Sequence, residues 1–343
     1  MVLKVLFAGY KNPNYRAVTD FIEAGLVELG HDVRFFDYRG FVLPGRARDR
    51  FPALERWDRA RLNRRLRALA RDYRPHLLLV NGGHTLEPET IRAVRETGAK
   101  TALWTSDYPL LIDVYVKLAP HYDRYFLSGT DVVEHHRRAG NPDGIFLPFA
   151  CLPDLHKPVE LDDADRRRYR CDVFFAGTAY PERVALLTAL AGLGVELAIW
   201  GPGFEALPEG HPLRRRVRGS ALSTEGFVKA ASGCKLAFNF MGNPMAPQME
   251  ELCNSRVFEL LGCGACQLVD AKGDVRKLFQ NGRELLWFEN EAQLLELTRR
   301  WLSDDEGRRA LGRRAREAAL AQHTYRHRLT ELIRACGLSD DRR

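Results

Sequence analysis

The sequence lacks any long hydrophobic run. None of its apolar stretches approaches the roughly 18–20 residues that a helix needs to cross a bilayer. The chain opens directly with the apolar segment 2–9, and neither a charged stretch nor a cleavage site precedes it. We therefore expect no signal peptide and a location in the cytoplasm. A mean hydropathy of −0.32 with 45% hydrophobic residues is typical of a soluble globular protein.

A disulfide framework is also missing. The seven cysteines are odd in number and scattered along the chain, which disfavours a set of bridges. Cys263 and Cys266 form a CxxC pair, but only Cys253 lies near them in the sequence. A zinc site would need two further ligands at suitable spacing. We therefore expect these cysteines to be small packing residues between a helix and a strand, and we expect no metal.

No glycine-rich dinucleotide fingerprint is present. Gly9 follows the first expected strand alone, where a GxGxxG turn would be needed, so a dinucleotide-dependent enzyme is disfavoured. A length of 343 residues exceeds one average core and predicts two domains of about 150 residues each.

Charge is concentrated in one segment. Residues 46–74 hold eleven arginines against four acidic residues, a net charge of +7, which equals that of the whole chain. Leu54, Trp57, Leu62 and Leu66 recur there at helical spacing and predict a basic amphipathic helix. It can be a solvated face, a patch for the anionic inner face of a membrane, or a nucleic-acid patch. Nucleic acid is not expected, because no recognised reader module appears.

Short apolar strands alternate with helical stretches along the whole chain. This pattern predicts α/β domains with parallel sheets covered on both faces. Three prolines between Leu147 and Pro158 interrupt the alternation, so we place the domain boundary there, between 1–150 and 151–335, with the last helix able to pack back on the first domain. The expected strands are 2–8, 32–37, 76–80, 100–104, 124–128, 145–147, 171–176, 195–200, 216–218, 235–240, 265–270 and 285–288. The expected helices lie near 14–29, 53–73, 88–97, 130–138, 181–192, 223–232, 254–262, 274–280, 290–302, 304–321 and 324–336.

Two glutamates frame a short segment that predicts a ligand site. Glu251 and Glu259 stand eight positions apart, and Asn254 between them is a good N-cap for a helix that the following glycines end. On one continuous helix, the two carboxylates would lie roughly 12 Å apart along the axis. If Glu251 instead precedes the helix, both can line one elongated ligand, with Arg256 and the helix N-terminus facing a diphosphate. A nucleoside diphosphate sugar has this form. Ordinary solvated or capping carboxylates are the alternative.

A second candidate anion site follows the expected strand 171–176. Gly177 lets the main chain approach a ligand, Thr178 can cap the next helix, and Pro181 suits its first turn. Arg183 then lies within one turn of a helix N-terminus, where a diphosphate binds favourably. A plain strand-to-helix turn with a surface arginine is the alternative.

These segments resemble the donor-binding half of GT-B glycosyltransferases, most closely the CgeB-like branch of the glycosyl transferases group 1 family. The resemblance is carried by Gly177-Thr178 followed by Arg183, and by Asn254-x-Arg256-x-Phe258-Glu259. It covers roughly 145–335, and the first half only in outline. It implies two doubly wound Rossmann-like domains that face each other across a cleft.

The resemblance also implies roles for particular residues. Glu259 would bind the ribose, and Glu251 would act in catalysis, because the Glu-x7-Glu spacing is associated with retaining GT-B enzymes. Further donor-binding residues implied by the family pattern are Gly201, Gly219, Ser220 and Asn239.

The N-terminal half offers candidate acceptor-binding residues after its expected strands. His84 and Asp107 each follow such a strand and can orient or deprotonate an acceptor hydroxyl. Either residue can equally be a loop cap, and Asp107 before Tyr108-Pro109 also suits a turn.

The expected function is transfer of a sugar from a nucleoside diphosphate sugar to an acceptor hydroxyl, retaining and metal-independent, with the nucleotide sugar as co-substrate and no other cofactor. The acceptor would be a glycan, a lipid-linked molecule or another small molecule. Two alternatives remain open. A nucleotide-sugar epimerase would convert the donor without an acceptor, and a non-catalytic basic adaptor would bind membranes or polyanions through residues 46–74.

Overall fold

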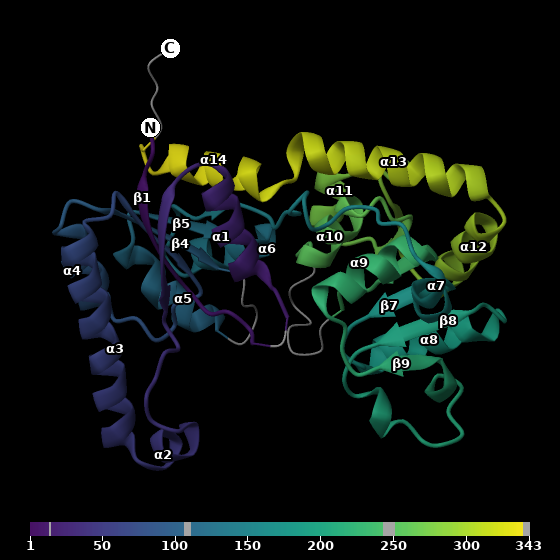
Figure 1. The fold of residues 1–343 in the computed structure, drawn as a ribbon, viewed down its shortest axis with the longest axis horizontal. Helices are drawn as coiled ribbons and strands as arrows, with labels where there is room; N and C mark the ends of the chain where they lie inside the picture. Colours follow the sequence, from purple (N-terminus) through teal and green to yellow (C-terminus); the bar gives the residue numbers. More distant parts are fainter. Residues whose placement is uncertain (14, 106–110, 243–250, 339–343) are drawn as a thin grey trace. The chain divides into compact units, whose positions relative to one another are not determined.

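The computed structural model describes residues 1–13, 15–105, 111–242 and 251–338. The chain forms two compact units. Unit 1 comprises Met1–Pro148 and the chain from Arg326 onward, and unit 2 comprises Phe149–Tyr325. The two units are described separately below (Figure 1).

Unit 1 is built on a six-stranded parallel sheet in the order β2-β1-β3-β4-β5-β6. Its strands are β1 (Lys4–Gly9), β2 (Asp32–Asp37), β3 (Leu77–Asn81), β4 (Lys100–Thr105), β5 (Arg124–Leu127) and β6 (Ile145–Phe146). Its helices are α1 (Val18–Glu28), α2 (Gly45–Arg50), α3 (Pro52–Tyr73), α4 (Pro88–Arg95), α5 (Ile112–Leu118), the 3-10 turn η1 (Ala119–His121), α6 (Thr130–Arg138) and α14 (Tyr325–Ala335). The last helix is joined to this unit by Arg328, whose Nε donates to the Pro148 carbonyl at 3.0 Å.

Unit 2 holds a second six-stranded parallel sheet in the order β12-β11-β10-β7-β8-β9. Its strands are β7 (Cys171–Ala176), β8 (Leu197–Trp200), β9 (Val217–Gly219), β10 (Cys234–Asn239), β11 (Gln267–Asp270) and β12 (Leu286–Phe288). Its helices are α7 (Asp163–Tyr169), α8 (Pro181–Gly192), η2 (Phe204–Ala206), η3 (Arg214–Arg216), α9 (Thr224–Gly233), α10 (Ser255–Gly262), α11 (Gly273–Leu278), α12 (Glu291–Leu302) and α13 (Asp305–Gln322). The predicted α/β class with two doubly wound parallel sheets is confirmed.

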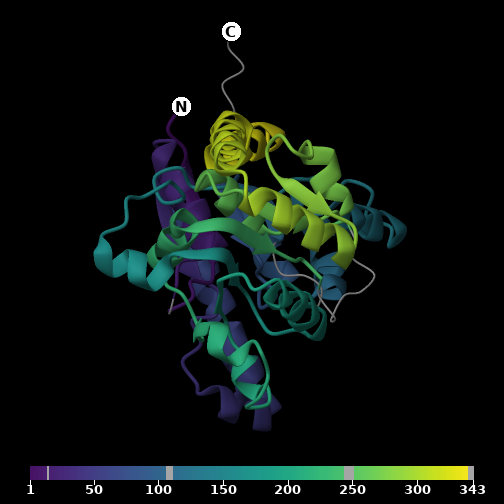
Figure 2. The ribbon, with the colours of Figure 1, turned by 90° about the vertical axis from the view of Figure 1, so that its right-hand side faces the viewer.

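Alternation along the strands of unit 2 divides its core into two layers. Phe175 of β7 faces a layer formed with α8, α12 and α13, whereas its neighbour Phe174 faces a layer formed with α9 and α10. Successive side chains of a strand point to opposite faces, so a nearly continuous apolar strand can serve both layers. Figure 2 shows helices on both sides of this sheet.

The basic segment of unit 1 differs from its prediction. It forms two helices rather than one, because α2 precedes α3, and α5 was also not expected. Leu62 and Leu66 are buried as the helical spacing predicts, but Leu54 and Trp57 are 38% and 50% exposed. Figures 1 and 2 show the reason, since the end of α3 that carries α2 projects beyond the strands of unit 1. Its apolar stripe therefore continues past the core that it covers.

The loops after β7 and β8 approach each other at main-chain distance. The amide of Gly177 donates to the Trp200 carbonyl at 2.9 Å, and the amide of Ala179 donates to the Pro202 carbonyl at 3.0 Å. Gly201, at φ +146°, lies directly against Gly177, and a Cβ at Gly201 would overlap the Gly177 carbonyl oxygen. Only glycine combines this backbone conformation with this close approach.

Replacing Gly201 by alanine should therefore destabilise unit 2. The added Cβ would meet main-chain atoms that cannot rotate away, and the positive φ adds strain, so we expect a loss of at least about 2 kcal/mol in urea unfolding. Gly210→Ala is the matched control, because a Cβ at Gly210 would meet nothing within 4 Å. Equal stability of the two variants would contradict the packing described for the two loops.

Candidate functional site

The strand order of the unit 2 sheet reverses between β7 and β10, which makes this position the topological switch point of the sheet. The chain runs from β7 through β8 to β9 on one side, and then from β10 through β11 to β12 on the other. In open parallel sheets, the loops that leave two such strands diverge, and ligands bind at the carboxyl ends there. The strands end at Ala176 and Asn239, so the loops that begin at Gly177 and Phe240 mark the expected position.

The loop after β7 leads into α8, but the residue that caps this helix differs from the prediction. Pro181 occupies the first helical position as expected, but the N-cap is Tyr180, and Thr178 does not cap the helix. Thr178 instead offers its carbonyl oxygen to the amide of Tyr180 at 2.9 Å and to Arg183. Gly177 is closely surrounded, because a Cβ there would come within 3.4 Å of both Phe175 and the Arg183 guanidinium.

Arg183 connects the two diverging loops. Its Nε donates to the Phe240 carbonyl at 3.1 Å, and its Nη1 donates to the Thr178 carbonyl at 3.3 Å. The guanidinium also lies over the Tyr180 ring, 4.8 Å from its centroid. The predicted anion-binding arginine is therefore held at the switch point of the sheet, and its hydrogen-bond partners are carbonyl groups rather than carboxylates.

Arg256 reaches the same place from α10. Its Nη1 donates to the carbonyl of Ala176, the last residue of β7, and its guanidinium lies 5.1 Å from the centroid of Phe227. Its Nε is buried and has no hydrogen-bond partner among the residues that the structure describes. The predicted N-cap of this helix is confirmed, because Asn254 accepts from the Val257 amide at 3.2 Å.

An amide pair fixes the start of α10 against the end of β10. Asn239 and Asn254 donate to each other's side-chain oxygen at 3.1 and 3.2 Å. Reciprocal hydrogen bonds of this kind define the relative position of the two elements, so Arg256 in the first turn of α10 is placed with them.

The two arginines leave a surplus of positive charge at this edge. Burial, and then the charge of Arg256, lower the pKa of Arg183, while Tyr180 and Asp270 oppose that change. Both guanidinium groups remain charged, since arginine is not deprotonated in proteins. Because their hydrogen-bond partners are neutral carbonyls, an anion here would relieve the repulsion between them.

Glu259 lies on the same side of α10 as Arg256, because residues three apart are neighbours on a helix surface. The side chain is only 9% exposed, and its carboxylate has no hydrogen bond or ion pair within the described part of the chain. Its oxygens are not among the fully buried atoms that lack a partner, so they reach solvent and can accept hydrogen bonds from a ligand's hydroxyl groups.

Glu251 precedes α10, as its predicted role requires, but it is engaged elsewhere. Its carboxylate accepts from the Lys277 ammonium at 2.8 Å and lies against Gly273, while its carbonyl accepts from the Asp274 amide at 2.9 Å. The structure therefore places Glu251 beside the first turn of α11, near the carboxyl end of β11.

The remaining predicted donor residues occupy the carboxyl ends of β8 and β9. The amide of Gly201 donates to the Gly219 carbonyl at 3.0 Å, and Ser220 follows directly. The neighbouring Arg218 is tied to the body of unit 2 through the Arg168 and Arg170 carbonyls at 2.8 and 3.0 Å. Gly201, Gly219 and Ser220 thus share one edge of the sheet with Gly177.

Asp270, at the end of β11, was missed by the sequence analysis. It is only 6% exposed, and its Oδ1 accepts from the Met241 amide at 2.8 Å. Its Oδ2 has no hydrogen-bond partner among the described residues. Burial raises the pKa of Asp270 to about 6, although Lys272 and Arg183 act in the opposite direction. The sequence did contain a signal for this residue, namely an acidic residue at the carboxyl end of a buried strand.

In unit 1, His84 follows β3 at the carboxyl edge of the sheet. Gly82 and Gly83 before it adopt φ of +85° and +80°, and its ring packs edge-on against Tyr38 at 5.5 Å. Asp107, the other predicted acceptor-site residue, lies outside the described residues.

Comparisons with known proteins agree with this fold. Residues 182–334 match a family described as glycosyl transferase-like. The sequence gives no match among curated proteins. The sucrose-phosphate synthase of Thermosynechococcus elongatus is similar in structure, with a TM-score of 0.70 and 13% identity over 96% of this chain and 98% of that chain.

Two further solved structures are similar. One is Anabaena HepE, solved in complex with UDP and glucose, with a TM-score of 0.63 and 13% identity over 97% of this chain and all of that one. The other is a glycosyltransferase from Rickettsia africae, with a TM-score of 0.67 and 10% identity over 98% of each chain. The predicted GT-B fold is confirmed by these likenesses.

The buried carboxyl of Asp270 gives a testable pH dependence. Its pKa is higher in the folded chain than its usual 3.8, so the native state binds the extra proton. The contribution of the protonated Asp270 carboxyl group to the free energy of unfolding is fully present below the pKa of the unfolded chain and is lost as the pH rises through about 6. Asp270→Asn removes this loss. Relative to wild type, the variant should gain about 2 kcal/mol in urea unfolding between pH 4.5 and 7.5. A pH-independent difference would show that the carboxyl ionises freely.

Proposed function

We propose that this protein is a glycosyltransferase that moves a sugar from a nucleoside diphosphate sugar to an acceptor hydroxyl. The observation that carries the proposal is the convergence of Arg183 and Arg256 at the switch point of the unit 2 sheet, between β7 and β10. The family match over residues 182–334 supports the activity class, and the UDP complexes of HepE support the donor class. The motif from Asn254 to Glu259 supports a place in the CgeB-like branch.

The donor would be held by groups of three kinds. Arg183, Arg256 and the N-terminus of α10 would bind the diphosphate, since helix N-termini and guanidinium groups both favour phosphate. Glu259 would accept from the ribose hydroxyls. Main-chain groups around Gly177, Gly201, Gly219 and Ser220 would approach the nucleoside closely, and the amide pair of Asn239 with Asn254 would keep α10 in place.

The chemical step breaks the bond between the anomeric carbon and a phosphate oxygen and forms a bond to the acceptor oxygen. Negative charge develops on the departing diphosphate, and preorganised cationic donors of this kind contribute about 3–4 kcal/mol each to the rate. We propose that the anomeric configuration is retained and that the two arginines replace a metal ion. The leaving phosphate oxygen would then take the acceptor's proton, and Glu251 and His84 are the candidates for orienting the sugar and the acceptor.

Ligand-dependent stabilisation tests the donor site. Nucleoside diphosphates at 100 times their dissociation constant should add about 2.7 kcal/mol, which corresponds to several degrees in melting temperature. Glu259→Gln should abolish the shift and leave the melting temperature without ligand nearly unchanged. The matched control is Glu296→Gln, on the exposed face of α12.

Two results would contradict this assignment. A full shift in the Glu259 variant would remove Glu259 from the nucleotide site. Conversion of a nucleotide sugar to a new sugar without any acceptor would identify an epimerase instead.

We further propose that the protein contacts an anionic membrane through the projecting end of α3. Four large apolar side chains are exposed there, namely Val42 (52%), Phe51 (51%), Leu54 and Trp57. The Asp58 carboxylate accepts from the amides of Val42 and Leu43 at 3.0 and 2.9 Å, which holds the loop beside the helix. Aromatic and aliphatic side chains ringed by arginines fit the interface of an anionic bilayer. Among the described residues, no helix is long and apolar enough to cross a membrane.

Flotation with lipid vesicles tests the membrane contact. The protein should bind vesicles of phosphatidylglycerol and phosphatidylcholine, and bind pure phosphatidylcholine far less. Leu54→Ser should weaken binding about five- to tenfold through lost apolar burial. Leu320→Ser on α13 is the matched control, because Leu320 is 40% exposed. Equal effects of the two substitutions would exclude the end of α3 as the contact.

A further inference from the structure

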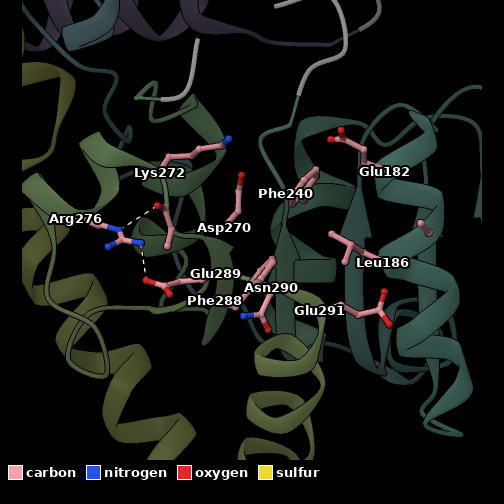
Figure 3. A pocket seen from close by; sticks show the side chains of 12 residues that line it. Glu182, Leu186, Phe240, Asp270, Lys272, Arg276, Phe288, Glu289, Asn290 and Glu291 are labelled. Carbon is pink, nitrogen blue, oxygen red and sulfur yellow. Dashed lines mark hydrogen bonds and ion pairs between the residues drawn. The ribbon is translucent and has the colours of Figure 1, made fainter. Parts of the chain in front are cut away.

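Unit 2 contains a cavity that none of the proposed donor-binding residues lines. It has a volume of about 530 Å³, within the range of roughly 300–1,000 Å³ typical of small-molecule sites. It opens at the carboxyl ends of β10, β11 and β12, between the first turns of α8 and α12 (Figure 3). Its lining includes Phe240, Phe288, Asp270, Lys272, Glu182 and Glu291.

The cavity combines an apolar base with polar walls. Phe240 and Phe288 belong to the packed layer under α8, so their rings are fixed by the core. One wall is preorganised by Arg276, whose Nε donates to the Ala271 carbonyl at 3.1 Å and whose Nη2 pairs with Glu289 at 2.7 Å. Figure 3 shows Glu182 and Glu291 on the α8 and α12 side, opposite Asp270 and Lys272. A ligand would therefore meet rigid aromatic surface below and carboxylates on two sides.

The strongest sign that the cavity takes a ligand is the state of Asp270. This carboxyl group is more than nine-tenths buried and lines the cavity, and its Oδ2 is without a hydrogen-bond partner in the part of the chain that the structure describes. Leaving a buried polar atom unsatisfied is costly. A ligand group that donates a hydrogen bond to Oδ2 would remove that cost.

The charges of the walls select the chemistry of the ligand. With Arg276 neutralised by Glu289, the carboxylates Asp270, Glu182 and Glu291 outnumber the single ammonium of Lys272, which disfavours an anion such as a phosphate. A metal ion is disfavoured too, since no group of three or more His, Cys, Asp or Glu side chains among the described residues is placed to hold one. A hydroxyl group can donate to a carboxylate and accept from an ammonium, so a neutral polyhydroxylated molecule satisfies both.

From these observations we infer that this cavity is a carbohydrate subsite that binds one uncharged sugar ring, with the ring against the partly buried Phe240 and its hydroxyls on Asp270, Lys272 and Glu291. The sugar can be free or can be one residue of a glycan. The inference goes beyond the proposed transferase activity and does not depend on it, because none of the proposed donor-binding residues lines the cavity, although Arg183 lies beside it through its hydrogen bond to the Phe240 carbonyl.

Ligand-observed NMR and calorimetry with neutral sugars test the subsite. The probes are glucose, galactose, N-acetylglucosamine and maltose, each titrated into the full-length protein. At least one should bind saturably, and a saturating amount of UDP should not displace it. Tighter binding of maltose than of glucose by tenfold or more identifies a glycan as the source, and equal binding identifies a free sugar.

Two variants and a matched control locate the binding. Asp270→Asn keeps the oxygen that accepts from Met241 but replaces the unpartnered acceptor with a donor, and should weaken sugar binding about tenfold or more. Glu291→Gln, on the exposed start of α12, should weaken it several-fold, whereas Glu296→Gln on the same helix should leave it unchanged. The UDP-induced thermal shift should survive in all three variants, which separates failure of this subsite from failure of the donor site.

The inference is overturned by absence of saturable binding for every sugar. It is overturned equally by unchanged affinity in both the Asp270 and the Glu291 variants, or by displacement of the sugar by UDP. Because Glu291 is exposed, its variant stays interpretable even where Asp270→Asn alters stability.

Discussion

The proposed chemistry depends on how two guanidinium groups are held at the switch point of the unit 2 sheet, between β7 and β10. Arg183 and Arg256 donate to the carbonyls of Phe240, Thr178 and Ala176, all of them neutral acceptors. A carboxylate partner would have cancelled their charge, but a carbonyl fixes the geometry and leaves the charge in place. The folded chain thus carries an electrostatic cost at this edge that an anionic ligand can offset.

Two close contacts shape the loops that position these arginines. The approach of Gly201 to Gly177 brings the loops after β7 and β8 together, and the Asn239 and Asn254 amide pair brings α10 to the end of β10. Both contacts involve short or absent side chains, at the ends of β7, β8 and β10 and at the N-cap of α10. The rigid parallel sheet then transmits their geometry to residues far apart in sequence, which is why residues 176, 183, 240 and 256 meet.

Sequence patterns predicted the parts of this arrangement that local chemistry determines. The N-cap at Asn254 and the first-turn proline at Pro181 follow from capping preferences, and the two parallel sheets follow from apolar strands alternating with helices. The exposure of Leu54 and Trp57 was not predictable, since helical spacing identifies an apolar stripe but not the length of core beneath it. The state of Asp270 was hidden for a similar reason, because its burial comes from β10, β11 and α8 together.

Charge couples Arg183 to Asp270, which lines the neighbouring cavity. The charge of Arg183 lowers the pKa of Asp270, and the charge of Asp270 raises that of Arg183, although no hydrogen bond joins them. An anion bound at Arg183 adds negative charge near Asp270 and so opposes its ionisation. By linkage, protonation of Asp270 must favour the anion to the same extent. Anion binding at Arg183 and protonation of Asp270 would therefore be coupled through space, with no movement of the backbone required.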